Sequence, residues 1–394
     1  MKVLVLGAGG FIGGHAAAGL RAAGHEVVPG KVDFTRALRP DDWLPSLRSI
    51  DAVVNAVGIL RETGNRTFNT LHYAAPRALF DACILSGVRR VVQVSALGAD
   101  EAARSRFHRT KRGADDYLAS TSLDWAVVQP SLVFGEGGRS ARLFALLAAL
   151  PLTPLPGDGR QRIQPIHVDD LTEVIVKLIG VPMKIRMQAV GPREIVVREW
   201  LRILRAQMDL PRPRFIDVPL WLVPVDRETL QMLARGNTGS AATITQLLRR
   251  APRDPKDFVA PDQRKALALR AKLDWLLPLL RACIGIVWLV SGAVSLGLYP
   301  LQDSLALLAR VGLAGTPALA ALYGAAGLDI VLGLATFFFP RRWIWRFQIA
   351  LVLAYSAIIA IWLPELWLHP FGPVLKNLPL LAGLMLLHEL DTGR

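Results

Sequence analysis

Closely spaced glycines near the amino terminus are the first residues whose type and spacing indicate a chemical task. Gly7, Gly10 and Gly13 lie between an apolar run and an alanine-rich stretch, the order expected of a strand, a tight turn and a helix. Glycines there let the backbone approach a pyrophosphate, and the free N–H groups of a helix start attract its charge. The pattern predicts a dinucleotide site whose first contacts are Gly7, Gly9, Gly10, Phe11, Ile12 and Gly13.

The residues after the second expected strand, 26–28, bear on the choice between the two nicotinamide dinucleotides. A basic residue at its end accommodates the 2′-phosphate of NADP, whereas an acidic residue binds the free ribose hydroxyl of NAD. If the strand ends near Gly30, Lys31 takes this position and NADP is favoured. If the strand continues to Val32, Asp33 takes it and NAD is favoured. We expect NADP, with NAD as the alternative.

The elements that must position these residues alternate along the chain. A further apolar strand, 50–58, ends in small residues that let a cofactor lie over the strand end, and the contacts expected there are Ala56, Val57 and Gly58. An expected helix at 74–86 and a strand at 90–94 follow. This alternation predicts an α/β fold with a Rossmann-type, doubly wound parallel sheet.

Together these segments resemble the extended and atypical short-chain dehydrogenase/reductase superfamily. The most specific stretches, 154–159 and 164–171, resemble the atypical group that includes the nucleotide-binding accessory subunit of respiratory complex I and NmrA-like proteins. The resemblance covers about residues 1–260. It implies an NAD(P)-binding Rossmann domain with a small substrate lobe within about 135–160 and 185–260.

The resemblance also assigns catalytic roles. Ser95 closes a strand where the superfamily carries its active-site serine, and Lys111 matches the lysine that binds the nicotinamide ribose. The superfamily's acid is a Tyr four residues before that Lys, and this chain has Phe107 there. The ordinary carbonyl/alcohol mechanism therefore lacks its proton donor. We expect His108 to face solvent, because it points about 100 degrees away from Phe107 around the helix.

Further contacts follow from the resemblance. The strand at 125–135 matches a family segment in which Gln129 replaces an Arg. In the superfamily pattern an Asp followed by an apolar residue lies beside the adenine, which places Phe34 there with Asp33. His167 and Asp169 match a pair that fastens the substrate lobe to the Rossmann core. The cofactor-binding residues added in this way are Ser95, Lys111, Phe34, Gln129, Pro130, Ser131 and Val133, and no metal site is expected.

Composition indicates that part of this 394-residue chain does not face water. Its hydrophobic content is 52% and its mean hydropathy +0.35, whereas soluble proteins contain roughly 45–50% apolar residues. Apolar segments long enough to span a bilayer follow the front part of the chain. They are residues 275–298, 316–339, 347–363 and 371–387.

The net charge of +14 suggests nucleic acid at first, but its distribution argues against that partner. Residues 249–272 carry eight basic and three acidic side chains directly before the first apolar segment. A cytoplasmic membrane surface explains this placement better than DNA. The cysteines, Cys83 and Cys283, fall in apolar stretches, so a reducing compartment fits and no disulfide framework is expected. We also expect no export signal, because the first apolar run is too short.

The positive-inside rule predicts the topology of the back part. Arg341, Arg342 and Arg346 lie between the second and third apolar segments, on the same predicted side as the basic run. Four spans in the cytoplasmic membrane with both termini in the cytoplasm satisfy this rule. The end segment 369–379, with Ser291 and Gly292, resembles DoxX-like membrane proteins. The expected domains are 1–260, a basic linker 261–274, and an all-α four-helix transmembrane domain 275–394.

Asp329 lies in the middle of the second apolar segment, where a carboxyl group needs a partner or a function. We expect Arg281 to pair with it, and a role in proton or quinone handling is the alternative. The whole pattern predicts a membrane-anchored NAD(P)(H)-binding oxidoreductase that acts on a lipophilic quinone, isoprenoid or lipid.

Other functions fit the same sequence. One is a catalytically degenerate NAD(P)H-binding assembly or sensor module, which Phe107 favours. Another is a substrate-binding lobe joined to a transport activity in the membrane helices. The expected partners are the lipid bilayer, a lipophilic small molecule, and a membrane protein or a second copy of the chain, but not nucleic acid.

Overall fold

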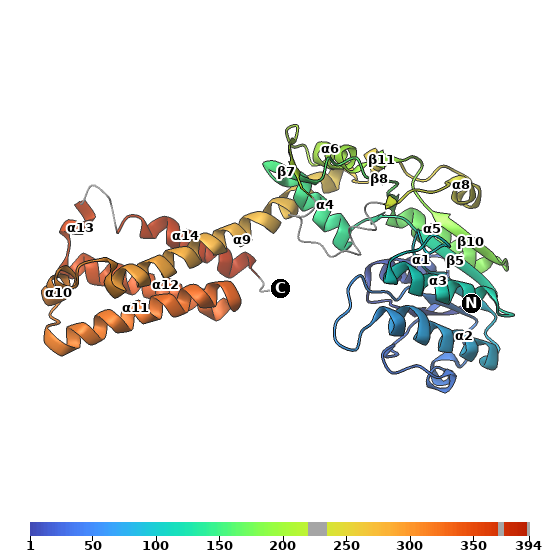
Figure 1. Cartoon of the computed structure of the whole chain (residues 1–394), viewed down its shortest axis with the longest axis horizontal. Helices are drawn as coiled ribbons and strands as arrows, with labels where there is room; N and C mark the ends of the chain where they lie inside the picture. Colours follow the sequence, from blue (N-terminus) through green and yellow to red (C-terminus); the bar gives the residue numbers. More distant parts are fainter. Residues whose placement is uncertain (220–234, 369–373, 392–394) are drawn as a thin grey trace. The chain divides into compact units, whose positions relative to one another are not determined.

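The computed structural model describes residues 1–219, 235–368 and 374–391, which fall into two units. The N-terminal unit comprises Met1–Ala271 and the C-terminal unit Lys272–Arg394 (Figure 1). Within the segment 261–274, which the sequence predicts as a basic linker, the structure has a short 3-10 turn and the start of a long helix.

Six parallel strands form the central sheet of the N-terminal unit, in the order β10-β5-β4-β3-β1-β2. The chain passes from β1 outward to β2 and then returns to β3 on the other side of β1. This reversal creates a crevice at the carboxyl ends of β1 and β3, where such sheets bind nucleotides. The strands are β1 (Lys2–Leu6), β2 (Glu26–Pro29), β3 (Ala52–Asn55), β4 (Arg90–Val94), β5 (Asp124–Pro130) and β10 (Ile185–Ala189).

Helices cover both faces of this sheet, as the apolar strands require. Alternate residues of a strand point to opposite faces, so Val3 and Val5 enter one core and Leu4 and Leu6 the other. The first core lies under α1 (Phe11–Ala22), α5 (Val168–Gly180) and α8 (Ala242–Leu248). The second lies under η1 (Pro40–Asp42), η2 (Leu44–Leu47), η3 (Asn69–Ala74), α2 (Ala75–Ser86) and α3 (Arg106–Ala119). The predicted doubly wound α/β fold is confirmed.

A third core belongs to a small lobe built from short strand pairs and two helices. Trp200 and Phe258 pack against Phe134 at its centre, with ring centroids 5.3 and 5.5 Å from that ring. The strand pairs are β6 (Val133–Phe134) with β9 (Ile166–His167), β7 (Leu152–Pro156) with β12 (Arg214–Val218), and β8 (Arg162–Ile163) with β11 (Ile195–Val196). The helices are α4 (Arg139–Ala149) and α6 (Val197–Gln207), and the turns η5 (Pro255–Asp257) and η6 (Pro261–Gln263) follow.

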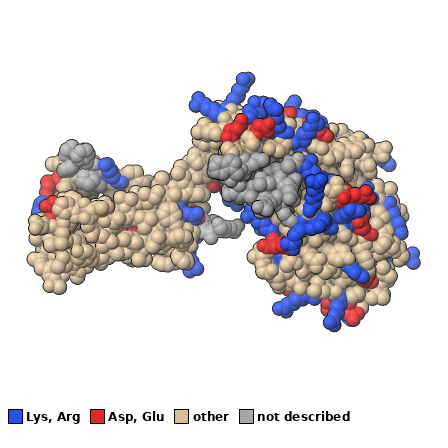
Figure 2. Space-filling view, viewed as in Figure 1, with Lys and Arg blue, Asp and Glu red and all other residues tan. Residues whose placement is uncertain are grey.

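The C-terminal unit is helical and largely apolar. Within the described residues, three stretches are long and apolar enough to cross a membrane: Pro261–Leu298, Gly315–Phe338 and Arg342–Trp362. Figure 2 shows an almost uncharged surface along these helices. The elements are α9 (Arg264–Ala293), η7 (Val294–Leu298), α10 (Leu301–Arg310), α11 (Gly315–Phe338), α12 (Arg342–Trp362), α13 (Glu365–Leu368) and α14 (Asn377–Leu390).

The fourth predicted span, 371–387, differs from the helix found there. Its first residues, 371–373, lie outside the described part of the chain, and α14 begins only at Asn377. At 14 residues, α14 is about 21 Å long, less than the thickness of a bilayer's hydrocarbon core. Residues 374–376 form a turn before α14, so an apolar pattern alone overestimated the length of this helix.

Candidate functional site

The glycine turn at the end of β1 has the shape that a pyrophosphate requires. Gly7 has a φ of +80°, and a Cβ on Gly13 would lie 2.1 Å from the Gly7 carbonyl oxygen, so both positions demand glycine. A Cβ on Gly9 would meet nothing within 4 Å. Gly10 caps α1 without a side-chain hydrogen bond, which leaves N–H groups of the first turn available. Open space beside free donors fits a dinucleotide phosphate.

Phe11 and Ile12 contribute to this turn through their backbones. The Phe11 ring lies edge-on to His15, with centroids 5.2 Å apart, and it lies close to Gly138 at the start of α4. The ring therefore anchors the turn to the small lobe. A contact of Phe11 with a nucleotide stays a prediction, and the group that would make it is the backbone N–H.

The end of β2 bears on the nucleotide's ribose. Strand β2 ends at Pro29, and the Gly30 N–H still donates to the Val5 carbonyl at 2.9 Å, so exposed Lys31 is the first residue beyond the ladder. Asp33 accepts hydrogen bonds from the Thr35 N–H and hydroxyl at 2.9 and 2.8 Å. These bonds lower the pKa of the Asp33 carboxyl and use it as a local turn cap.

The contact of Phe34 with the adenine stays a prediction for its backbone, because its ring lies in the second core. This side chain is 6% exposed and packs edge-on against Trp43, with ring centroids 5.0 Å apart. The ring belongs to the second core, because the chain turns inward after Asp33 and buries its next large apolar residue.

A buried polar cluster lies under the ends of β3 and β4, and we name it the Lys111 cluster after its central residue. The Lys111 ammonium donates to the carbonyl oxygens of Val57 and Val94 at 3.2 and 3.0 Å. The Ser95 hydroxyl donates to Asp115 Oδ2. Lys111 and Asp115 are one turn apart on α3, so both side chains reach the same strand ends. The cluster consists of Ser95, Lys111 and Asp115.

Burial shifts the pKa values of Lys111 and Asp115 toward pH 7. Desolvation lowers the pKa of Lys111 to about 8, against the opposing effect of the Asp115 charge. Desolvation raises the pKa of Asp115 to about 7, against the Ser95 hydrogen bond and the Lys111 charge. The spacing of four residues on one helix was the signal that could have revealed Asp115 from the sequence, and it was missed.

Phe107 occupies an aromatic pocket next to the Lys111 cluster. Its ring centroid lies 5.8 Å from Phe68, 5.2 Å from His72 and 5.2 Å from His108. His72 is fully buried, its Nε2 accepts the Ile59 N–H at 3.0 Å, and burial lowers its pKa to about 2, so it stays neutral. It lies on the π-helix η3, a conformation frequent at functional sites. Nothing in its sequence spacing pointed to His72.

The prediction that His108 faces solvent is wrong. The side chain is 6% exposed, and its Nδ1 lies 2.9 Å from the Ser105 hydroxyl. A Cβ on Gly98 would lie 3.1 Å from His108 Nε2. The loop that follows β4 therefore covers this side of α3, a long-range contact that helical spacing cannot foresee. Burial lowers the pKa of His108.

The predicted residues at the end of β5 and just beyond it are buried, and their polar groups contact other loops. Gln129 Nε2 donates to the Ala99 carbonyl at 2.9 Å, and the Ser131 hydroxyl donates to the Gln164 carbonyl at 2.5 Å. Pro130 accepts the Leu97 N–H at 2.9 Å, and Val133 packs in the first core. Their protein partners give these side chains a structural role, and direct contact with a nucleotide remains a prediction.

His167 and Asp169 hold together segments that are distant in the sequence. Arg253 lies 3.2 Å from His167 Nδ1 and 3.2 Å from Asp169 Oδ2, and the Phe258 ring packs on His167 with centroids 5.3 Å apart. These contacts fasten the chain before α9 to the start of α5. They support the structural role predicted for the pair.

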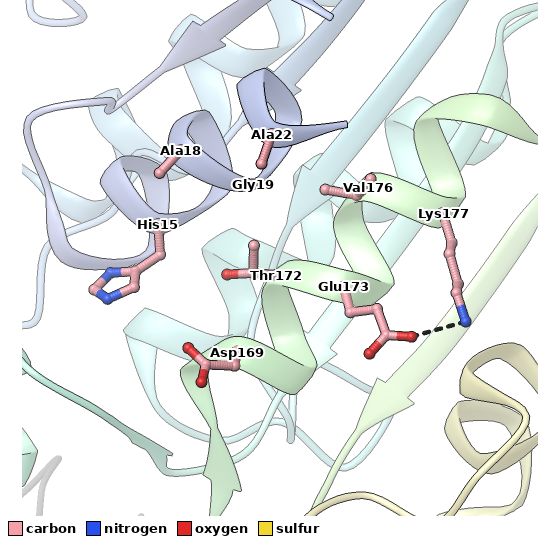
Figure 3. Close-up of a pocket in the computed structure, with 9 residues that line it drawn as sticks. All are labelled: His15, Ala18, Gly19, Ala22, Asp169, Thr172, Glu173, Val176 and Lys177. Atoms are coloured by element: carbon pink, nitrogen blue, oxygen red, sulfur yellow. Dashed lines mark ion pairs between the residues drawn. The ribbon is translucent and has the colours of Figure 1, made fainter. Parts of the chain in front are cut away.

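A shallow groove between α1 and α5 does not coincide with the glycine turn. Its floor is apolar, and the Glu173–Lys177 ion pair, 2.8 Å long, lies at its edge (Figure 3). A Cβ on Gly19 would lie 2.4 Å from Thr172, so the groove marks where the two helices pack closely. The lining residues are His15, Ala18, Gly19 and Ala22 from α1 and Asp169, Thr172, Glu173, Val176 and Lys177 from α5.

The expected pairing of Asp329 with Arg281 is also wrong. Arg281 Nη1 lies 3.5 Å from Asp391 instead. Asp329 is 8% exposed, and its Oδ1 has no hydrogen-bond partner among the residues that the structure describes. Helix packing turns the two side chains to different neighbours, which hydropathy alone does not determine.

Comparisons with known proteins divide the chain in the same way. Residues 7–179 match a family model described as NAD(P)H-binding, and residues 285–385 match the DoxX-like family. Mitochondrial subunit 9 of the NADH dehydrogenase [ubiquinone] 1 alpha subcomplex from Arabidopsis thaliana is 27% identical over 202 residues, which are 49% of this chain and 48% of that protein. The subunit from Mus musculus is 28% identical over 34% of this chain and 36% of its own length. The chain thus spans about half or less of these relatives.

Solved structures share the fold of the N-terminal unit. UDP-glucuronic acid 4-epimerase from Bacillus cereus, in complex with UDP-glucuronic acid and NAD, aligns with a TM-score of 0.52 and 17% identity over 70% of this chain and 100% of its own. RMD from Pseudomonas aeruginosa, complexed with NADPH, aligns with a TM-score of 0.52 and 17% identity over 68% and 98%. The sequence matches and the fold agree. Residues 7–179 thus carry a match to NAD(P)H-binding domains on a Rossmann-type fold, and residues 285–385 carry a match to the DoxX-like family.

Proposed function

We propose that this chain is a membrane-bound, NADP(H)-dependent oxidoreductase that acts on a lipophilic substrate such as a quinone, an isoprenoid or a lipid. The observation that carries the proposal is that the loop after β3 contacts both the glycine turn and the Lys111 cluster. A Cβ on Gly7 would lie 3.0 Å from the Ala56 carbonyl, and the next residue, Val57, accepts a hydrogen bond from Lys111. One short loop thus joins the phosphate-binding turn to the buried ammonium.

Each part of this surface suits a part of the nucleotide. The free N–H groups after Gly10 suit the pyrophosphate, and Lys31, directly beyond β2, suits a 2′-phosphate. Lys111 is the candidate to hold the nicotinamide ribose, as the superfamily resemblance implies. When bound, a reduced nicotinamide supplies a hydride to an electrophilic substrate.

The proton must come from a different source than in the superfamily's usual mechanism. Phe107 carries no ionisable group, and the Ser95 hydroxyl is engaged with Asp115. A substrate that takes its protons from water avoids this difficulty, and a quinone is such an acceptor. The DoxX-like domain and the three long apolar helices favour a substrate that dissolves in the membrane.

A second candidate is an NAD(P)H-holding module without turnover. The close aromatic packing of Phe107 with Phe68 and His72 favours it, because this packing fills the position of the missing acid. The names of the mitochondrial relatives describe subunits of an NADH dehydrogenase. This module would act through a protein partner in the membrane.

Nucleotide binding is tested most cleanly at Gly9, with the full chain in mild detergent. A Cβ at Gly9 has open space around it, so Gly9→Val should leave the fold unchanged and fill the space proposed for the phosphates. We expect NADPH binding, followed by fluorescence titration, to fall at least about tenfold. Gly180→Val is the matched control, since a Cβ there also meets nothing within 4 Å. Equal binding by both variants would contradict a nucleotide site at the turn.

The choice between NADP and NAD is tested at Lys31. Its contact with a 2′-phosphate is charge-assisted, so Lys31→Ala should weaken NADPH binding about tenfold and NADH binding much less. Lys184→Ala serves as the control, because that ammonium bonds only the Thr121 carbonyl, at 3.3 Å, among the described residues. Equal losses for both nucleotides in Lys31→Ala would remove this basis for selectivity.

Turnover separates the enzyme from the module. NADPH-dependent reduction of decylubiquinone by the wild type, lost in Gly9→Val, would support the enzyme. Phe107→Tyr adds a phenol one helical turn before Lys111, and such a general acid contributes roughly 10²- to 10⁴-fold in rate where a substrate is positioned. Tight NADPH binding without turnover by the wild type or Phe107→Tyr would favour the module.

We further propose that both termini lie in the cytoplasm, with the nucleotide domain beside its cofactor pool. The basic residues before α9 and Arg341, Arg342 and Arg346 at the start of α12 support this orientation. It requires α14 to cross the membrane together with residues before it. Reporter fusions near Asp303 and after Arg394 should then give opposite readouts, and identical readouts would contradict the four-span topology.

A further inference from the structure

Polar side chains of helices α11 and α12 lie at two heights along this helix pair, which we call the first and the second level. At the first level, Gln348 Nε2 donates to the Thr336 hydroxyl at 2.8 Å. Seven residues back along α11 from Thr336 is Asp329, and seven residues forward along α12 from Gln348 is Tyr355. Seven residues are about two helical turns, so both side chains stay on the facing sides of the helices. The Tyr355 side chain is half-buried.

The first level is closed. Trp288 Nε1 donates to Gln348 Oε1 at 2.9 Å, and the Thr336 hydroxyl donates to the Leu332 carbonyl at 2.8 Å. Thr336 and Gln348 are fully buried. Every polar side chain of this level therefore has a partner, and the level needs no ligand.

The second level is not satisfied by hydrogen bonds. Asp329 Oδ1 is buried without a hydrogen-bond partner in the described ranges, and Arg281 is engaged by Asp391. On the α9 side there is no space: a Cβ on Gly292 would lie 2.8 Å from the Ala326 carbonyl, and one on Gly333 would lie 2.6 Å from Leu289. An unpaired carboxyl in the hydrocarbon region is costly, so a proton or a ligand must satisfy it.

We infer that Asp329 and Tyr355 form a binding site, halfway along α11, for the hydroxyl group of a neutral lipid-soluble alcohol or phenol. A hydroxyl group both donates and accepts, and this pair offers a carboxyl acceptor and a phenol donor at one level. A ketone or an ether offers no donor for Asp329. A cationic ligand would have to lose its hydration to reach this depth. The inference concerns the membrane unit alone and does not depend on nucleotide chemistry.

The test uses the full chain in lipid nanodiscs with tritiated farnesol as the probe. Farnesol should bind saturably and be displaced by 4-nonylphenol, while the methyl ethers of both compounds should compete at least about tenfold more weakly. Asp329→Leu should weaken farnesol binding about tenfold or more, and Tyr355→Phe by a smaller factor. Thr336→Val, in the closed level, is the matched control and should bind farnesol like the wild type.

Several results would overturn the inference. One is competition by the methyl ethers as strong as that by the alcohols, and another is unchanged farnesol binding in Asp329→Leu. Dicyclohexylcarbodiimide, which modifies protonated carboxyls, provides an independent readout by mass spectrometry. Labelling of Asp329 that farnesol does not slow would show a site for a proton only. Folding of each variant is checked by its thermal midpoint, which Asp329→Leu should not lower, because it removes an unpaired buried carboxyl.

Discussion

Asp115 in the N-terminal unit and Asp329 in the C-terminal unit are both buried carboxyls, but their surroundings differ. Each has an Oδ1 without a hydrogen-bond partner among the described residues. Asp115 lies beside the Lys111 ammonium and accepts a hydrogen bond from Ser95. Among the described residues, no ammonium group and no hydroxyl group bonds Asp329. A buried carboxyl is thus stabilised by its neighbours in one unit and left to a proton or a ligand in the other.

The architecture of the two units explains this difference. Parallel strands end together at one edge of a sheet, and their terminal carbonyl groups can hold an ammonium in place. Val57 and Val94 do so for Lys111. Helix α11 offers no such groups, because its backbone carbonyls are used within the helix.

The largest expected effect comes from removing the cation of the Lys111 cluster. Lys111→Met leaves two buried carbonyls and Asp115 without their partner, so it should lower the free energy of unfolding by about 3 kcal/mol or more. NADPH binding should be lost with it. Denaturation with urea, followed by circular dichroism, measures the change.

Lys177→Met is the control for Lys111→Met. Its ammonium also bonds two carbonyls, those of Leu247 and Leu248 at 3.1 and 3.2 Å, and the Glu173 carboxylate. It is about one-third exposed, so the loss should stay below about 1 kcal/mol. If both variants lost the same free energy of unfolding, burial of Lys111 would not explain its contribution to stability.

A smaller effect is expected in the pH dependence of stability. The folded pKa of Asp115 is raised from 3.8 to about 7, so its contribution is fully present below pH 3.8 and is lost as pH rises to about 7. The folded pKa of Lys111 is lowered from 10.5 to about 8, so its contribution is present above pH 10.5 and is lost as pH falls to about 8. The thermal midpoint of the wild type should therefore pass through a minimum between pH 7 and 8.

Substitution of Asp115 by Asn sharpens this test. Asp115→Asn keeps an acceptor for the Ser95 hydroxyl but cannot ionise, so the decline below pH 7 should disappear. Asp329→Asn should leave that decline in place, because it alters only the C-terminal unit. A decline that persists in Asp115→Asn would assign it to another group.

The smallest effect is expected at Arg281. Its guanidinium is 28% exposed and lies 3.5 Å from Asp391, so Arg281→Gln should change the thermal midpoint by the equivalent of less than about 1 kcal/mol. Carbodiimide labelling of Asp329 should not change, because the two side chains do not pair in the structure. Faster labelling in Arg281→Gln would show that Arg281 does protect Asp329 in the membrane.

Local patterns could be predicted because their cause is local. The glycine turn needs only steric freedom in a few adjacent residues, and the apolar runs on either side of it can be buried only as strands or helices. For the same reason the sequence indicated the membrane segments, although it overestimated the last one. The missing acid at Phe107 was visible from the resemblance to the superfamily.

By itself, the sequence determined the doubly wound sheet, the place of the glycine turn, the helix that carries Lys111 and the apolar helices, since periodicity and backbone sterics act over one or two turns of chain. Only the tertiary structure decided the partners of individual polar side chains. It buried His108 under the loop after β4, joined Ser95 to Asp115, and turned Arg281 toward Asp391. These pairings depend on contacts between segments far apart in the chain, where a small rotation of one helix exchanges one partner for another.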